Sequence, residues 1–98
     1  MKEMRSKYVL INRNKLTFLI HGNKTDFHRM FPGEWCNEIE VMYHGRTRKY
    51  IETKSLKAAM CYGNKSAAEY TLARYNRESF RQNVPDFHIA KIDICYEI

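Results

Sequence analysis

Residues 7–21 read KYVLINRNKLTFLIH, and this stretch constrains the fold more than any other part of the chain. Two runs rich in β-branched and aromatic residues flank Arg13 and Asn14, a polar pair suited to a tight turn because asparagine tolerates positive φ. A two-residue loop at this point predicts a β-hairpin in which Ile11 lies opposite Leu16.

Both faces of this predicted hairpin are apolar. One face would carry Val9, Ile11, Leu16, Phe18 and Ile20, and the other would carry Tyr8, Leu10, Thr17 and Leu19. Strands that are apolar on both sides must be covered on both sides. We therefore expect the hairpin to lie in the interior of a sheet, or to be covered on its second side by a loop or by another subunit.

The segment of residues 24–37 is a candidate for that cover. It concentrates four large apolar side chains: Phe27, Met30, Phe31 and Trp35. We expect an irregular segment with one helical turn capped by Thr25, followed by a turn at Pro32-Gly33. These side chains would anchor the segment over the hairpin; the alternative is an exposed aromatic platform on which nucleic-acid bases stack.

Residues 38–53, EIEVMYHGRTRKYIET, predict a second hairpin that turns through a three-residue loop, His44-Gly45-Arg46. With that loop, the side chains expected to face the core are Ile39, Val41, Tyr43 and Ile51, and those expected to face outward are Glu38, Glu40, Met42, Arg48 and Tyr50. Residues 87–98 alternate apolar and polar side chains and predict a final strand.

Two consecutive helices are expected between the second hairpin and the final strand. Residues 54–62 predict a short helix, capped by Thr53 or Ser55 and stopped by Gly63, whose inner side chains would be Leu56, Ala59 and Met60. Residues 64–82 predict a longer helix, because Ser66 and Glu69 have the capping-box spacing. Its apolar face would consist of Ala68, Leu72, Tyr75 and Ser79.

This order of elements predicts one α+β domain spanning residues 1–98. Its sheet would be mostly antiparallel with about five strands, formed by two hairpins and the C-terminal strand, and both helices would pack on one face.

The net charge of +6 and the pI near 9.3 favour a polyanionic partner. Ten candidate binding residues, eight lysines and arginines with two tyrosines, fall in three groups along the chain. These ten residues are Arg46, Arg48, Lys49 and Tyr50 on the second hairpin, Lys54 and Lys57 on the short helix, and Tyr70, Arg74, Arg77 and Arg81 on the outer face of the long helix. On a common face they would bind phosphates without strong sequence preference, and the tyrosines could stack on unpaired bases.

We therefore expect a small binding protein that engages RNA or single-stranded nucleic acid. The alternative is an inhibitor that docks the same basic face on an acidic groove of a host enzyme. A third interpretation is a solvated helix face with no partner. The apolar first hairpin and open strand edges also suggest a homodimer.

Enzymatic signatures are weak in this sequence. The histidines and cysteines lack the short spacing of a structural zinc site, no serine or cysteine stands in a nucleophile motif, and no glycine loop suits a phosphate, so we expect no cofactor. The best enzymatic alternative is a metal-free ribonuclease that uses His44 beside the cations of the second hairpin.

The three cysteines, Cys36, Cys61 and Cys95, are an odd number without a CxxC motif and fit a reducing cytosol. The N-terminal residues MKEMRSKY lack the apolar segment of a signal peptide, and no apolar run is long enough to span a membrane. These features predict a cytoplasmic protein.

Residues 54–76, KSLKAAMCYGNKSAAEYTLARYN, show the texture of the whole chain, which is short, basic and rich in lysine, asparagine and tyrosine. In this respect the chain resembles the small basic early proteins of tailed phages. The resemblance implies stoichiometric inhibition of a host factor, often a defence system, and it transfers no functional residue.

Overall fold

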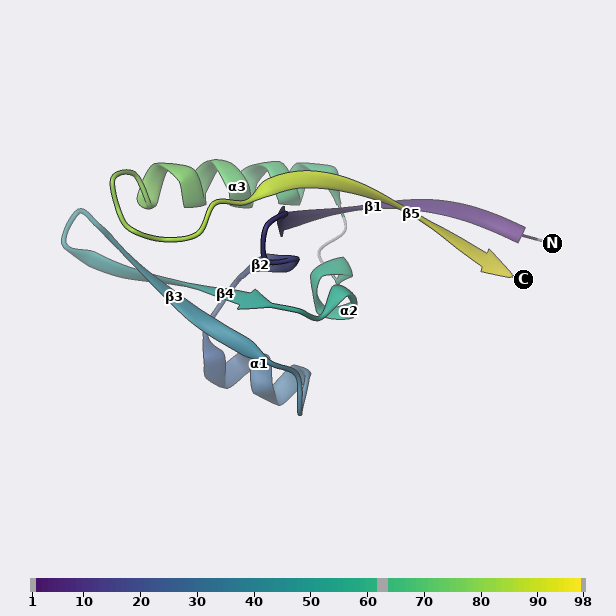
Figure 1. The fold of residues 1–98 in the computed structure, drawn as a ribbon, viewed down its shortest axis with the longest axis horizontal. Coiled ribbons are helices and arrows are strands. Elements are labelled where there is room, and N and C mark those ends of the chain that lie inside the picture. Colours follow the sequence, from purple (N-terminus) through teal and green to yellow (C-terminus); the bar gives the residue numbers. More distant parts are fainter. Residues whose placement is uncertain (1, 62–63, 98) are drawn as a thin grey trace.

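The computed structural model describes residues 2–61 and 64–97, which form an α+β domain (Figure 1). Within these residues, five strands make one antiparallel sheet in the order β3-β4-β2-β1-β5, so the fold class and the sheet are as predicted. In chain order, the elements are β1 (Lys2–Asn12), β2 (Thr17–His21), α1 (Lys24–Met30), β3 (Cys36–Tyr43), β4 (Arg46–Thr53), α2 (Leu56–Met60), α3 (Lys65–Glu78) and β5 (His88–Glu97).

The first hairpin occupies the interior of the sheet, as its two apolar faces require. On one face, Leu10 and Leu19 are buried with Tyr75 of α3. On the other face, Ile20 is buried with Phe27 of α1 and Ala58 of α2. Phe27 therefore covers the hairpin face that carries Ile20, with Phe31 packed beside it. Met30 and Trp35, also expected to anchor this segment, are exposed instead.

The two consecutive helices, in contrast, do not share a face. Figure 1 shows α3 on one side of the twisted sheet and α1 with α2 on the other, in agreement with the buried clusters. The prediction that both helices pack on one face is wrong in this respect. The physical reason is the same two-sided hairpin, because α1 alone covers only Ile20 and its neighbours, while Ala59 of α2 covers Val9 and Phe18.

The loop of the first hairpin has four residues rather than two, so that Ile11 pairs with Phe18 and not with Leu16. The Asn12 side chain explains the longer loop, since its carbonyl oxygen accepts hydrogen bonds from the backbone N–H groups of Asn14 and Lys15, both at 3.0 Å. Leu16 takes a left-handed conformation with φ 54° and is exposed. The side-chain faces are otherwise unchanged, because this register differs from the predicted one by two residues.

The second hairpin turns through two residues, His44 and Gly45, both at positive φ (50° and 73°), and Tyr43 pairs with Arg46. The predicted three-residue loop was wrong, because a two-residue turn of this type matches the twist of the flanking strands. Shifting the register by one residue moves every side chain of β4 to the opposite face. Tyr50, predicted to face outward, is consequently fully buried opposite Ile39.

Asparagine and serine side chains cap the helices. Asn64 caps α3 by accepting from the backbone N–H groups of Ser66 and Ala67, so the predicted capping box at Ser66 is wrong. Asn23, rather than Thr25, caps α1. Ser55 caps α2 as predicted, and its predicted stop at Gly63 lies outside the described residues.

The end of α3 and the orientation of Leu56 also differ from the sequence prediction. Helix α3 ends at Glu78, four residues before the predicted end at Gln82, and Arg81 lies beyond it at φ 62°. Leu56, predicted to face inward from α2, is 38% exposed, while Ala58 and Ala59 are buried. The predicted apolar face of α3 is confirmed by the burial of Ala68 and Tyr75.

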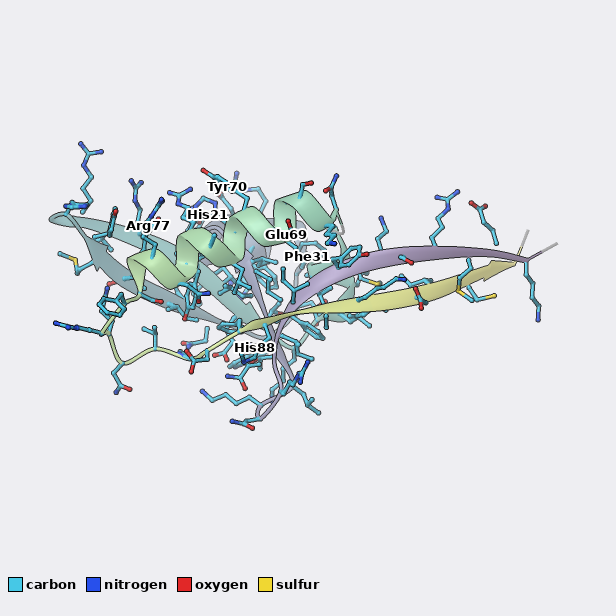
Figure 2. The ribbon with its side chains drawn as sticks, turned by 90° about the horizontal axis from the view of Figure 1, so that it is seen from above. His21, Phe31, Glu69, Tyr70, Arg77 and His88 are labelled. Atoms are coloured by element: carbon cyan, nitrogen blue, oxygen red, sulfur yellow. The ribbon has the colours of Figure 1, made fainter. Side chains whose placement is uncertain are left out.

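Strands β1 and β5 pair over ten residues and form a long ribbon (Figures 1 and 2). Strand β2 pairs with β1 only at Ile11 and Asn12, so the N-terminal half of β1 and the C-terminal half of β5 extend beyond the rest of the sheet. The molecule is therefore elongated, with principal extents of 52 × 27 × 23 Å. In the described part of the chain, no helix combines the length and apolar character needed to cross a bilayer.

Candidate nucleic-acid interface

Two open hollows lie beside α3 and share His21 and Arg74. The first, of about 270 Å³, is also lined by Tyr50, Tyr70 and Thr71. The second, of about 300 Å³, continues past His21 to Arg48 and the backbone around Gly22. Figure 2 shows His21, Tyr70 and Arg77 on the same side of α3. The middle of α3, the end of β2 and the first half of β4 thus build one concave surface.

A buried carboxylate lies beneath this surface. Glu78 is 2% exposed, and its Oε1 accepts a 2.6 Å hydrogen bond from Arg74 Nε, one helical turn earlier. Its Oε2 lies 3.8 Å from Arg48 Nε on β4. Because a buried carboxylate is stable only when it is paired, Glu78 holds the Arg74 guanidinium group by a hydrogen bond, forms a longer ion pair with Arg48, and neutralises one of their two charges.

This polar cluster is not fully satisfied. Arg48 Nε, the Tyr50 hydroxyl and Glu78 Oε2 are buried without a hydrogen-bond partner among the described residues. Burial, and then the neighbouring Glu78 carboxylate, raise the pKa of Tyr50 to about 12, so its hydroxyl keeps its proton. Unsatisfied buried polar groups are rare in native proteins and are often found where a ligand or water binds.

His21 stands between the two hollows, with its ring edge against the Tyr50 ring at 5.5 Å between centroids. Burial lowers the pKa of His21 below its ordinary value of 6.5, and the positive charges of Arg74 and Arg48 lower it further, against an opposing effect of Glu78. The imidazole is therefore neutral at pH 7 and can accept a proton or a hydrogen bond.

Four of the five predicted arginines, all except Arg81, share a side of the molecule. Arg46 and Arg48 alternate with Thr47 on β4 and lie on the face that packs against α3. Arg77 lies over the Tyr43 ring, which is the cross-strand partner of Arg46, at 5.6 Å. We call the set Arg46, Arg48, Arg74 and Arg77, together with Tyr70 and His21, the arginine face.

The other predicted binding residues are not part of the arginine face. Lys49 is among the residues that line the second hollow, where its backbone carbonyl accepts from Gly22 N–H at 3.4 Å. Its side chain points to the opposite face of β4 and pairs with Glu38 and Glu40 at 3.5 and 3.9 Å. Lys54 and Lys57 belong to the α2 side of the sheet, where Lys54 lies over the Trp35 ring. Arg81 lies past the end of α3 and over the exposed ring of Phe80.

Tyr50 and two residues outside the predicted set also change the site. The Tyr50 ring is buried and cannot stack on a base, although Tyr50 is among the residues that line the first hollow. The binding residues predicted from the sequence did not include His21 or Glu78. The spacing of Arg74 and Glu78, i and i+4 on one helix, was a usable sequence signal for that ion pair. His21 carried no such signal, because it meets α3 only through the tertiary fold.

In residues 2–61 and 64–97, no three histidine, cysteine or acidic side chains come together as a metal site would require. Cys36 Sγ and His28 Nε2 approach each other to 3.4 Å on the α1 side, away from the arginine face.

Comparison with known proteins finds no matching family model, no similar curated sequence and no similar solved structure.

Proposed function

We propose that the arginine face binds the phosphate backbone of RNA or another single-stranded nucleic acid. The observation that carries the proposal is the pair Arg48 and Arg74, held by the buried carboxylate of Glu78 at the edge of a hollow. The Arg74 guanidinium group, fixed by its hydrogen bond, loses little conformational entropy on binding. The planar donors of both arginines match phosphate oxygens, and Arg48 Nε has no hydrogen-bond partner among the described residues.

The exposed aromatic ring at the edge of the hollow favours a single strand over a duplex. Tyr70 is 68% exposed beside Arg74, one turn away on α3. Unpaired bases stack on such rings without sequence preference, whereas the bases of a duplex are not accessible to them. Arg46 and Arg77 extend the positive surface toward the tip of the second hairpin.

The chain offers a matched pair of variants for the test. Arg46→Ala with Arg77→Ala removes two cations of the arginine face that form no ion pair within the described chain, and Lys54→Ala with Lys57→Ala removes two cations on the α2 side. Each double variant lowers the net charge by two. Affinity for a labelled single-stranded RNA is measured against salt concentration for both variants and the native protein.

We expect the arginine variant to bind more weakly and its log–log salt slope to shrink by about 1.4, at roughly 0.7 per lost phosphate contact. The lysine variant should retain the native slope. Equal losses in both variants would indicate binding through net charge alone. No binding by the native protein, together with capture of a host protein from nuclease-treated lysate, would favour the inhibitor interpretation.

A second candidate function, cleavage of RNA without a metal, is favoured by one observation: His21 lines the second hollow together with Arg48 and Arg74. Burial and the charges of these arginines lower its pKa, which favours the neutral imidazole that a base needs. The imidazole would take the proton of a 2′-hydroxyl as the 2′-oxygen attacks phosphorus. The bond to the 5′-oxygen breaks, that oxygen takes a proton from water, and the product is a 2′,3′-cyclic phosphate. The arginines would stabilise the charge of the pentacoordinate phosphorus.

His44, the base expected from sequence, lies at the hairpin tip against the Tyr43 ring, 4.2 Å between centroids, and lines neither hollow. Cleavage should therefore be lost in His21→Ala and kept in His44→Ala. RNA that stays intact on long incubation with the native protein would reject this candidate and leave the binding proposal standing.

A further inference from the structure

Strand β5 forms an open edge of the sheet. It is the last strand in the sheet order, and it pairs with β1 from His88 to Glu97 without a bulge or a proline. Within the described residues, no hydrogen bond joins its outer edge to another element. A long, regular edge of this kind is normally protected by charges, bulges or cover, because it can otherwise pair with another chain.

The sequence of β5 is complementary to itself in the antiparallel direction about Ile92. In that register Ile92 lies opposite Ile92 of a second copy, and Lys91 of each copy lies opposite Asp93 of the other. The next pairs are Ala90 with Ile94 and Ile89 with Cys95. Apolar residues therefore meet apolar residues, and each lysine meets an aspartate.

Neighbouring registers lack this match. Moving the centre of symmetry by one residue places Lys91 opposite Lys91, or Asp93 opposite Asp93, and like charges directly opposite are destabilising. Moving it by half a residue places Ile92 opposite Lys91 or Asp93, which brings apolar side chains against charged ones. The charge pattern thus selects one register.

The apolar side of β5 is also left incomplete by the single chain. Ala90 and Ile92 pack against the buried cluster of Val9, Phe18 and Ala59, yet both are only partly buried, as is Ile94. Pairing about Ile92 would place the same three residues of a second copy beside them and extend that cluster across the symmetry axis. On the opposite side of the strand, Asp93 Oδ1 accepts a 2.8 Å hydrogen bond from Ser6 Oγ and lies 3.8 Å from Lys91 Nζ of its own chain. In the dimer, each exposed Lys91–Asp93 pair would therefore meet the equivalent pair of the other copy, with opposite charges facing each other.

We propose that two copies of this chain associate through β5, paired antiparallel about a two-fold axis at Ile92, so that the two five-stranded sheets become one. This proposal is independent of nucleic-acid binding, because β5 contributes no residue to the arginine face.

Charge reversal tests the register. Lys91→Asp alone places aspartate opposite aspartate, and Asp93→Lys alone places lysine opposite lysine, so each variant should be a monomer by light scattering at a concentration where the native protein is a dimer. In a mixture of the two variants, each aspartate at these positions again lies opposite a lysine of the other copy, so a heterodimer should form. The double variant Lys91→Asp with Asp93→Lys should again form a homodimer.

A native protein that stays monomeric at every concentration, or single variants that dimerise as the native protein does, would overturn the proposal. Circular dichroism checks that each variant is folded. A second measurement does not depend on the charged pair: Ile89→Cys places a new thiol opposite Cys95 of the other copy. Mild oxidation should then give a covalent dimer, and adding Cys95→Ser should abolish it; a covalent dimer that persists without Cys95 would contradict the register.

Discussion

Among single residues, His21 has the most informative titration. Its pKa is lowered in the folded protein, so the unfolded chain binds a proton more readily. The corresponding contribution to stability is complete above the unfolded pKa of about 6.5 and is lost as the pH falls through the lower folded value.

A phosphate near the His21 ring favours the imidazolium, so bound single-stranded RNA should raise the pKa of His21, and binding should tighten as the pH falls. Titration of the imidazole resonances by NMR measures both effects, with His21→Asn to assign the signal; a free pKa at or above 6.5 would contradict the expectation.

Glu78 gives a prediction in which stability and binding change in opposite directions. Glu78→Gln removes the charge that pairs with Arg74 and Arg48, and we expect a loss of about 2–3 kcal/mol in the free energy of unfolding, as for hydrogen bonds to charged groups. The glutamine amide oxygen can still accept the hydrogen bond from Arg74, but it neutralises neither guanidinium group, so affinity for single-stranded RNA at low salt should rise. Glu69→Gln is the matched control, because Glu69 is exposed on the same helix and, within the described chain, forms an ion pair only with exposed Lys65 at 3.8 Å. Denaturant unfolding measures the free energy of unfolding, which should change little in the control. RNA titration measures affinity for Glu78→Gln and for the control.

At the scale of elements, apolar patterning predicted more than turn geometry did. The two apolar faces of the first hairpin placed it in the interior of the sheet, and the helical spacing of Ala68, Leu72 and Tyr75 identified the buried side of α3. These patterns extend over many residues, so an error of one position does not change the conclusion.

The turns were harder to predict, because one residue decides them. The choice between a two- and a three-residue loop at His44-Gly45 inverted β4 and moved Tyr50 from the predicted surface into the core. The same inversion determines which cations meet, since it brings Arg48 toward α3 and turns Lys49 away. The candidate site was therefore predicted as a set of residue types, while its membership depended on a local backbone conformation.

The first hairpin loop offers a test of stored backbone strain. Leu16 holds φ 54° while its side chain is 67% exposed, and the left-handed region costs a non-glycine residue about 1–2 kcal/mol. Leu16→Gly should remove this cost and raise the free energy of unfolding by roughly 0.5 kcal/mol after the entropy of glycine in the unfolded chain is included. The adjacent Lys15 is not at positive φ among the described residues, so Lys15→Gly should lower stability instead. Thermal unfolding measures both variants. If Leu16→Gly and Lys15→Gly changed the free energy of unfolding in the same direction, the strain at Leu16 would be contradicted.

For the whole molecule, the two proposals together predict bivalent binding. A two-fold axis that pairs β5 with itself in one sheet runs perpendicular to that sheet, so it leaves equivalent faces on the same side. Because α3 and the arginine face lie on one side of the sheet, the two arginine faces of a dimer would face the same direction. A single-stranded RNA long enough to reach both would bind the second face at high effective concentration.

We expect affinity to rise with RNA length, by about a hundredfold or more once the strand spans both arginine faces, in the native dimer and in the mixture of Lys91→Asp and Asp93→Lys. Each of these variants alone should show only the weak length dependence of a single site.

Net charge cannot produce this length dependence, because Asp93→Lys is more basic than the native chain by two charges and yet should lose the steep rise of affinity with RNA length. Filter binding with a graded series of oligomers measures it. A steep length dependence in the monomeric Asp93→Lys variant would show that the added affinity comes from further contacts along one chain rather than from the second copy.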